Sequence, residues 1–132
     1  MARKIFVNLP VGNLDASVAF FTALGFGFNP QFTDENATCM IVGDDIFVML
    51  LVRPFFATFT DRAIVDARRQ TEVLVCLSCD SDEEVDALVG KAVAAGGQAH
   101  RTAQDRGFMY GHGFVDPDGH AWELIHMREM PT

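Results

Sequence analysis

One acidic residue near the C-terminus, Glu123, is a group that could do chemistry. It lies in the stretch Ala121–Met127, which we predict to be a β-strand, so Glu123 shares a face with Ala121 and Ile125. A carboxylate among apolar neighbours is costly unless it is paired. Three roles are open for it: a counter-ion for a cationic ligand, a general base, or a structural residue paired with an internal cation such as an arginine.

Histidines could assist this carboxylate. The chain has four of them, His100, His112, His120 and His126. All but His100 lie near the C-terminal hairpin. We expect His112 on the strand that pairs with the Glu123 strand, where the two residues could form an acid–base pair or half of a metal site. Because residues two apart on a strand share a face, His112 should instead point to the same side as Phe114, toward a helix. We prefer this interpretation, in which His112 is structural.

Two glycines flank His112 at alternating positions. Gly111 and Gly113 should share a strand face with Met109. If this face lines a cleft, the glycines leave room for a ligand; otherwise they mark a bulge or a bend in the sheet. Tyr110 could supply a hydroxyl group at the rim of such a cleft.

The cysteines offer no obvious site. The chain has three of them, Cys39, Cys76 and Cys79. The pair Cys76–Cys79 has C-x-x-C spacing, but residues three apart on a strand point to opposite faces. A second cysteine pair for zinc is absent from the sequence. We therefore expect buried, reduced thiols, as in the cytoplasm.

Charge and hydropathy limit the partners. The net charge is −8 and the isoelectric point about 4.7. An acidic surface repels phosphate backbones, which argues against nucleic acid. The same charge would attract a cationic small molecule, but we prefer solubility as its explanation. No stretch approaches the roughly 20 apolar residues that span a bilayer, so we expect a cytoplasmic protein without a membrane segment.

The elements that position these residues fall into two similar halves. The first half begins with a predicted strand and a helix that Asn13 caps and Gly25 ends. Its expected strands are Lys4–Leu9, Ala37–Val42 and Ile46–Leu51, and the Phe-rich stretch Phe26–Phe32 is a candidate for a further one. If that stretch is a strand, the first half reads β-α-β-β-β.

The second half repeats this order. A capping box, Ser81 with Glu84, begins its helix, and Gly96-Gly97 ends it. Its expected strands are Glu72–Cys79, Gln98–Arg101, Phe108–Val115 and Ala121–Met127, with an Asp116-Pro117-Asp118-Gly119 turn before the last one. Aligning the halves matches Phe6 with Leu74, Leu9 with Leu77, Asn13 with Ser81 and Gly25 with Gly96.

The segment Arg53–Gln70 joins the two halves. It contains Phe55, Phe56 and Phe59, which we expect to pack on a sheet edge; a lid over a binding cleft is the other interpretation. The sequence thus predicts one α+β domain over residues 1–132, with module one at about 1–52, a connector at about 53–70 and module two at about 71–132.

The chain resembles the vicinal oxygen chelate superfamily, which includes glyoxalase I, bleomycin-resistance proteins and extradiol dioxygenases. The strand–helix stretch Leu9–Gly25 carries part of this likeness. The stretch Phe114–Leu124 is close to the superfamily's terminal D-P-D-G-H-x-x-E signature. The repeated β-α-β-β-β order covers nearly the whole chain.

The resemblance implies two tandem modules that form a half-open barrel around a central cleft. Metal enzymes of the superfamily hold a divalent ion there, with His, Glu or Gln ligands on the first and last strands of each module. In this chain the four positions fall on Phe6, Met49, Leu74 and Glu123. Three apolar side chains and one carboxylate do not make a hard-metal site, so no metal is expected.

The resemblance then predicts a metal-independent protein that binds a small molecule, as bleomycin-resistance proteins do. Its cleft would be lined by Phe6, Met49, Leu74, Gly111, Gly113 and Glu123. One alternative is a metal-dependent lyase or dioxygenase with a displaced ligand set, Glu123 and His112. Another is a cofactor-free enzyme that uses Glu123 as its base. Open sheet edges and the habit of the superfamily also suggest a homodimer.

Overall fold

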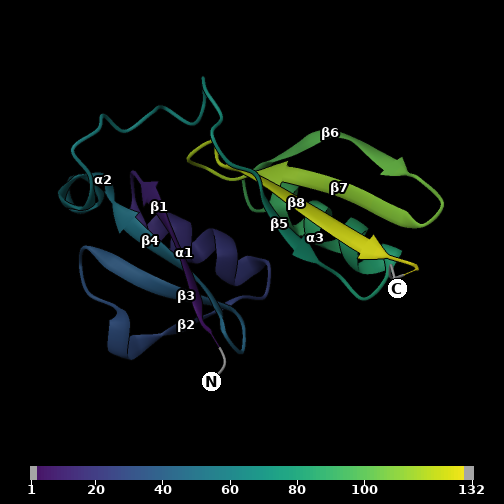
Figure 1. The fold of residues 1–132 in the computed structure, drawn as a ribbon, viewed down its shortest axis with the longest axis horizontal. Helices are drawn as coiled ribbons and strands as arrows, with labels where there is room; N and C mark the ends of the chain where they lie inside the picture. The colour runs from purple at the N-terminus through teal and green to yellow at the C-terminus, as the bar shows by residue number, and fades with distance from the viewer. Residues whose placement is uncertain (1–2, 130–132) are drawn as a thin grey trace. The chain divides into compact units, whose positions relative to one another are not determined.

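The computed structural model describes residues 3–129 of the chain. These residues form two compact units, the first ending at Val65 and the second beginning at Asp66. Each unit contains one four-stranded mixed sheet and one long helix (Figure 1). The predicted α+β class and the two tandem β-α-β-β-β modules are confirmed.

The sheet of the first unit has the strand order β1-β4-β3-β2. Strands β1 and β4 run parallel, and the other neighbours are antiparallel. The elements are β1 (Ile5–Val11), α1 (Leu14–Ala23), β2 (Gly27–Asn29), η1 (Pro30–Phe32), β3 (Ala37–Gly43) and β4 (Ile46–Val52).

Helix α1 begins and ends where the sequence predicts. The Asn13 side chain accepts a hydrogen bond from the backbone N–H of Ala16 at 3.0 Å. Gly25 follows the helix with φ of +102°, a conformation that costs glycine little. Phe20 and Phe21 of the helix are buried, as are Val48 and Leu50 of β4. The helix therefore covers one face of the sheet.

The second unit repeats this plan, with the strand order β5-β8-β7-β6. Strands β5 and β8 are parallel, and the remaining pairs are antiparallel. Its elements are β5 (Val75–Ser78), α3 (Asp82–Ala94), β6 (Gln98–Asp105), β7 (Met109–Val115) and β8 (Ala121–Met127).

A capping box begins helix α3. The Ser81 hydroxyl accepts a hydrogen bond from the N–H of Glu84 at 3.0 Å. The Glu84 carboxylate in turn accepts one from the N–H of Asp80 at 2.7 Å, one residue earlier than in the usual box. At the other end Gly96 has φ of +106°. Both predicted helix ends are therefore confirmed.

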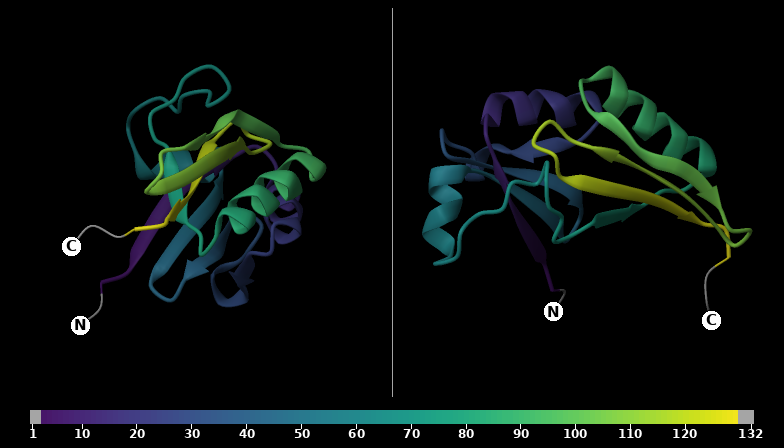
Figure 2. Two further views of the ribbon diagram at one scale, coloured as in Figure 1. Left: turned by 90° about the vertical axis from the view of Figure 1, so that its right-hand side faces the viewer. Right: turned by 90° about the horizontal axis from the view of Figure 1, so that it is seen from above.

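Helix α3 lies along one face of the second sheet (Figure 2). Phe114 pairs with Trp122 across β7 and β8, and the two rings stack with centroids 6.0 Å apart. Both side chains are buried, together with Val85 and Val89 of the helix. Because side chains alternate along a strand, residues next to Phe114 and Trp122 point to the opposite, open face.

The Asp116–Gly119 turn holds the end of this sheet together. The buried Asp116 carboxylate accepts hydrogen bonds from the N–H groups of Asp118 and His120 and from the indole N–H of Trp122, at 2.9, 3.0 and 3.0 Å. The Arg68 guanidinium donates to the Pro117 carbonyl at 2.6 Å. The turn motif thus organises the sheet through an internal hydrogen-bond network.

Several predicted element boundaries are wrong. The expected strand Phe26–Phe32 is short, because Pro30 begins the 3-10 helix η1 and cannot donate to a ladder. The expected strand from Glu72 starts only at Val75. Strand β6 continues beyond Arg101 to Asp105, past an irregularity in its pairing.

The connector contains a short helix, α2 (Arg53–Phe56), and a 3-10 turn, η2 (Ala57–Phe59). Helix α2 contacts β1 and β4, and the Phe55 and Phe59 rings pack edge to face at 5.1 Å. Helix α2 therefore lies beside β1 and β4, whereas Phe59 is exposed, and packing of the phenylalanines on the sheet edge stays a prediction. Within residues 3–129, no helix is long and apolar enough to cross a membrane.

Candidate functional site

One row of residues crosses the open face of the second sheet. Cys76 of β5 pairs with Glu123 of β8, Glu123 with Gly113 of β7, and Gly113 with His100 of β6. Paired residues of neighbouring strands point to the same face. Glu123 and His100 therefore stand on either side of a position that has no side chain.

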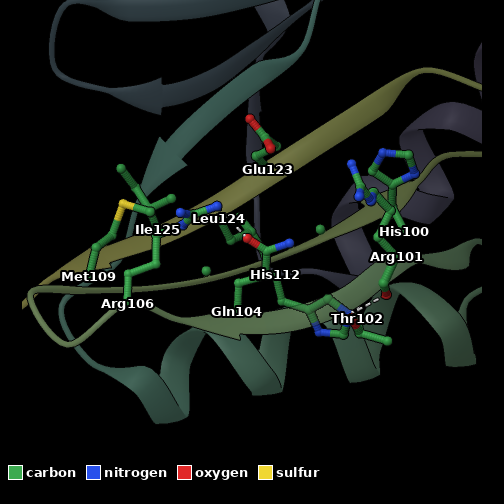
Figure 3. Close-up of a pocket in the computed structure, with 12 residues that line it drawn as sticks. His100, Arg101, Thr102, Gln104, Arg106, Met109, His112, Glu123, Leu124 and Ile125 are labelled. Carbon is green, nitrogen blue, oxygen red and sulfur yellow. Dashed lines mark hydrogen bonds between the residues drawn. The ribbon is translucent and has the colours of Figure 1, made fainter.

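A cavity of about 320 Å³ lies on this part of the sheet (Figure 3). Its wall includes Glu123 and His100, and its floor includes Gly111 and Gly113. Met109 and Ile125 add apolar surface to it. The volume is within the range of sites that hold small organic molecules. The predicted role of the two glycines, leaving space on the open face, is consistent with this position.

The Glu123 carboxylate has no hydrogen bond or ion pair with any side chain of residues 3–129. The structural role in which an internal arginine pairs with Glu123 has no support there. Glu123 also acts on the neighbouring thiol of Cys76, whose pKa is raised by burial and, to a lesser extent, by Glu123. The cavity thus contains a carboxylate that is available to a ligand.

A bulge in β6 forms another part of the cavity wall. Five residues of β6, from His100 to Gln104, lie opposite three residues of β7, from Gly111 to Gly113. Arg101 lies in this bulge with φ of +62°, the one non-glycine residue with positive φ in the described chain. The Nε2–H of His112 donates a hydrogen bond to the Arg101 carbonyl at 3.0 Å. His112 therefore holds the backbone of the bulge.

His112 and Glu123 do not form a joint site. His112 pairs with the buried Leu124, whereas Glu123 pairs with Gly113, so the two side chains leave opposite faces of the sheet (Figure 3). The register therefore does not bring these two residues together as an acid–base pair or as half of a metal site. The preferred interpretation, a structural His112 on the helix side, agrees with the register.

Tyr110 and His126 also belong to the helix side. The Tyr110 hydroxyl donates to Asp86 of α3 at 2.6 Å, and the Nδ1–H of His126 donates to Asp82 at 2.8 Å. The expected Tyr110 hydroxyl at the rim of the cleft is therefore wrong. Of the histidines on strands β6, β7 and β8, only His100 shares the face of Glu123.

The remaining predicted cleft residues are distributed over both units. Phe6 and Met49 lie on β1 and β4 of the first unit and share a sheet face, because Asn8, two residues after Phe6, pairs with Met49. Cys76, two residues after Leu74, pairs with Glu123 in the same way. This parallel supports the alignment of Met49 with Glu123. Leu74 itself precedes β5 and is half exposed.

These residues do not fit the divalent ion that the superfamily's enzymes hold. Phe6 and Leu74 have no donor atom, and the thioether of Met49 is a soft ligand that suits Cu(I) rather than a hard cation. In the part of the chain that the structure describes, no group of three or more His, Cys, Asp or Glu side chains is placed to hold a metal. We therefore derive no step through a metal.

A second cavity, of about 480 Å³, lies beside the Asp116–Gly119 turn. Arg68, His100 and Asp116 line it. Its charged groups are already engaged, because Asp116 accepts from Trp122 and Arg68 donates to the Pro117 carbonyl. The cavity around Glu123 is the stronger candidate for a ligand.

Sequence reasoning missed His100, Arg101 and Cys76 as residues of the site. Arg101 reaches it through the bulge in β6, which adds two residues to one side of the ladder only, whereas His100 lies just before the bulge, opposite Gly113. No local signal in the sequence marks that bulge, because Arg101 is not a glycine. Cys76 could have been found from strand pairing, once β5 is placed beside β8.

Comparison with known proteins gives one family match. Residues 3–43 match the family described as bleomycin resistance protein-like N-terminal. No curated protein matches the chain significantly.

Solved structures match over almost the full chain. A hypothetical protein from S. aureus is 28% identical with a TM-score of 0.81, and the match covers 96% of this chain and 94% of that one. A glyoxalase-related enzyme from Fulvimarina pelagi is 24% identical with a TM-score of 0.80, covering 99% and 92%. A bleomycin-binding protein, crystallised in complex with bleomycin, is 21% identical with a TM-score of 0.66, covering 95% and 98%.

The family match covers the first unit from β1 to the end of β3, and the structural matches extend the likeness over both units. Sequence motif, element order and fold therefore agree. Over both units the chain has the fold of glyoxalase-related and bleomycin-binding proteins, and residues 3–43 also match a bleomycin-resistance-like family, as the resemblance to the vicinal oxygen chelate superfamily implies.

Proposed function

We propose that the protein binds a small organic cation in the cavity on the open face of the β5–β8 sheet, without a divalent metal ion. The carboxylate of Glu123 is the group that binds the cation. The observation that carries the proposal is that this carboxylate lines a cavity and has no partner among residues 3–129.

Energetics support a ligand at this position. A carboxylate on a partly apolar surface loses hydration and gains nothing from a protein partner, so a cationic ligand that replaces the lost water is favoured. Met109 and Ile125 provide apolar contact, and Gly111 and Gly113 leave the floor free. The net charge of −8 attracts cations to the protein.

Two further observations agree with binding of an organic ligand. A structural relative with 21% identity was crystallised with bleomycin bound, so the same fold holds an organic molecule in that protein. In this chain, the side chains that align with the superfamily's metal positions are mostly apolar. Both favour binding that does not depend on an ion.

Calorimetry and thermal shift with matched aromatic probes test the proposal. Benzylamine should raise the melting temperature and bind with measurable heat, whereas benzyl alcohol, which has the same ring and no charge, should not. Glu123→Gln should remove the benzylamine effect and leave the melting temperature of the free protein nearly unchanged.

Glu35→Gln provides the control, because it removes one negative charge from an exposed turn in the first unit. This variant should bind benzylamine as the wild type does. Binding that survives Glu123→Gln would overturn the proposal. So would a tightly held divalent cation with three or more protein donors, measured as metal content after mild purification.

We also propose that the protein is a cytoplasmic homodimer. Strands β1, β2, β5 and β6 are edge strands within their sheets, and unpaired edges favour association with another chain. The thiols Cys39, Cys76 and Cys79 are free, which suits a reducing compartment. Light scattering on the purified protein should give twice the chain mass of 14.5 kDa; the mass of one chain would contradict the dimer.

A further inference from the structure

We propose that the ligand of this cavity carries an anionic group as well as a cationic one, and that the Arg101 guanidinium binds the anion. The natural ligand would then be zwitterionic, with an amine and a carboxylate, or a similar acid, held apart by an apolar spacer. This inference rests on the proposed function and specifies the ligand class for the same cavity.

Two opposite charges line the cavity without meeting each other. Glu123 is on β8 and Arg101 is in the bulge of β6, with strand β7 between them. Neighbouring strands lie about 4.7–4.9 Å apart, so the two backbones are separated by roughly 9–10 Å. Figure 3 shows the Arg101 side chain beside the His100 ring, on the Glu123 side of the sheet.

The Arg101 guanidinium makes no hydrogen bond or ion pair with the rest of residues 3–129, and the same holds for Glu123. Arg106, another cation of the cavity wall, donates to the Gln104 side chain at 2.7 Å. Of the two arginines that line the cavity, Arg101 is therefore the one whose guanidinium donors have no acceptor within residues 3–129. A molecule that spans β7 would satisfy a carboxylate at one end and a guanidinium fork at the other.

The backbone at Arg101 is built to hold this residue in place. A left-handed conformation is costly for arginine and persists only where its surroundings impose it, and such residues often lie at ligand sites. The surroundings here are the two additional residues of the bulge and the hydrogen bond from His112 to the Arg101 carbonyl at 3.0 Å. His112 is thus a positioning residue: it acts on the ligand through Arg101, from the other face of the sheet.

Calorimetry with three matched compounds tests the inference. The zwitterion 4-(aminomethyl)benzoate should bind at least tenfold more tightly than benzylamine, and benzoate should bind more weakly than either. Arg101→Gln should remove the advantage of the zwitterion over benzylamine, without weakening the binding of benzylamine itself. Arg106→Gln, which removes the same charge nearby, should keep most of the tenfold preference.

The role of His112 has its own test. His112→Phe keeps an apolar ring against the helix but removes the donor to the Arg101 carbonyl. It should lower the affinity for the zwitterion severalfold and leave the affinity for benzylamine intact. A purely structural role would lower both affinities together, and that result would remove His112 from the proposal.

Failure of this inference is distinguishable from failure of the proposed function. If benzylamine binds through Glu123 but the carboxylate of the zwitterion adds nothing, or its advantage survives Arg101→Gln, the zwitterionic class is wrong and the cation site stands. If no probe shows binding that Glu123→Gln removes, both proposals are overturned.

Discussion

Glu123 and His100 pair with the same residue, Gly113, from the strands on either side of it. An acid and an imidazole thus share one sheet face, separated by a position without a side chain. This spacing is what makes the face hollow, because any larger residue at Gly113 would stand between them. The backbone of β8 also requires glycine at position 113, because it lies too close for a Cβ atom.

Alanine substitutions at Gly113 and Gly111, the two glycines of the cavity floor, should differ in their effect on stability. A Cβ at Gly113 would lie 2.5 Å from the Trp122 carbonyl oxygen, which is backbone and cannot move aside. A Cβ at Gly111 would meet only ordinary contacts, at 3.4 Å from Ile125 and Leu124. Gly113→Ala should therefore destabilise the protein by about 1–3 kcal/mol, the usual cost of overpacking. Gly111→Ala should cost little or stabilise slightly, because alanine loses less backbone entropy on folding.

Urea unfolding of the two alanine variants measures this difference. Gly111→Ala also tests the position of the cavity, because it narrows the cavity floor while the fold stays intact. It should weaken benzylamine binding without lowering the unfolding midpoint. Equal midpoints for the two variants would show that the β7–β8 backbone is not as close at Gly113 as described.

Cys76 should report the charge of Glu123. Partial burial, and to a lesser extent Glu123, raise the pKa of the Cys76 thiol, and burial is the leading cause of a pKa of about 12 for Cys79. In the native protein Cys76 should react with Ellman's reagent more slowly than a free thiol, and Cys39 and Cys79 should be protected. Glu123→Gln should lower the Cys76 pKa and speed its reaction at a fixed mildly alkaline pH.

The control for this labelling experiment is Glu35→Gln, which should leave the rate at Cys76 unchanged. A bound cation at Glu123 should slow the reaction by covering the thiol. Indistinguishable rates for wild type and Glu123→Gln would contradict the proximity of the two side chains that the β5–β8 pairing gives.

The fold was predictable because its signals are local. Asn13 and Ser81 cap helices within three residues of themselves, and Gly25 and Gly96 end helices through their own positive φ. Strand alternation around Phe114 placed each side chain on its face, since the period of a strand is fixed. The terminal signature beginning at Asp116 added the resemblance to the superfamily, which local propensity cannot supply.

The candidate site was only partly predictable because it depends on pairing between distant strands. Glu123 and the floor glycines follow from parity within their own strands. Arg101 does not, because its direction depends on a bulge that exists only in the ladder between β6 and β7. The absence of a joint site for Glu123 and His112 follows from cross-strand register, where a one-residue slip reverses every face.

The buried carboxylate of Asp116 should be important for stability and not for binding. It accepts hydrogen bonds from Trp122, His120 and Asp118. Asp116→Ala leaves the indole N–H buried without this acceptor, which alone costs about 1–3 kcal/mol. Chemical denaturation should show this loss, whereas Asp44→Ala, at an exposed turn of the first unit, should have almost no effect. A loss below 0.5 kcal/mol, roughly the range of ordinary surface substitutions, would contradict the network.

The ion network around Arg128 should make stability depend on acid pH. Arg128 binds Asp105 and Asp82, and these hydrogen bonds lower the pKa of both carboxyls, that of Asp105 to about 2 from an ordinary 3.8. Between these values the unfolded chain binds more protons than the folded one, so stability falls as the pH falls. The contribution is complete above about pH 4 and lost as the pH passes through about 2.

Arg128→Met should therefore lower the melting temperature at neutral pH, and this difference from the wild type should shrink steadily below pH 4. Asp105→Asn should flatten the same part of the profile, because it removes one of the two carboxyls, whereas Asp44→Asn should leave the profile unchanged. Added salt should reduce the difference at neutral pH, since these side chains are partly exposed. The guanidinium of Arg128 also lies 5.6 Å from the centroid of the Tyr110 ring. If the difference in melting temperature between wild type and Arg128→Met stays constant down to the lowest pH, Arg128 stabilises the protein by packing on Tyr110 and not by its charge.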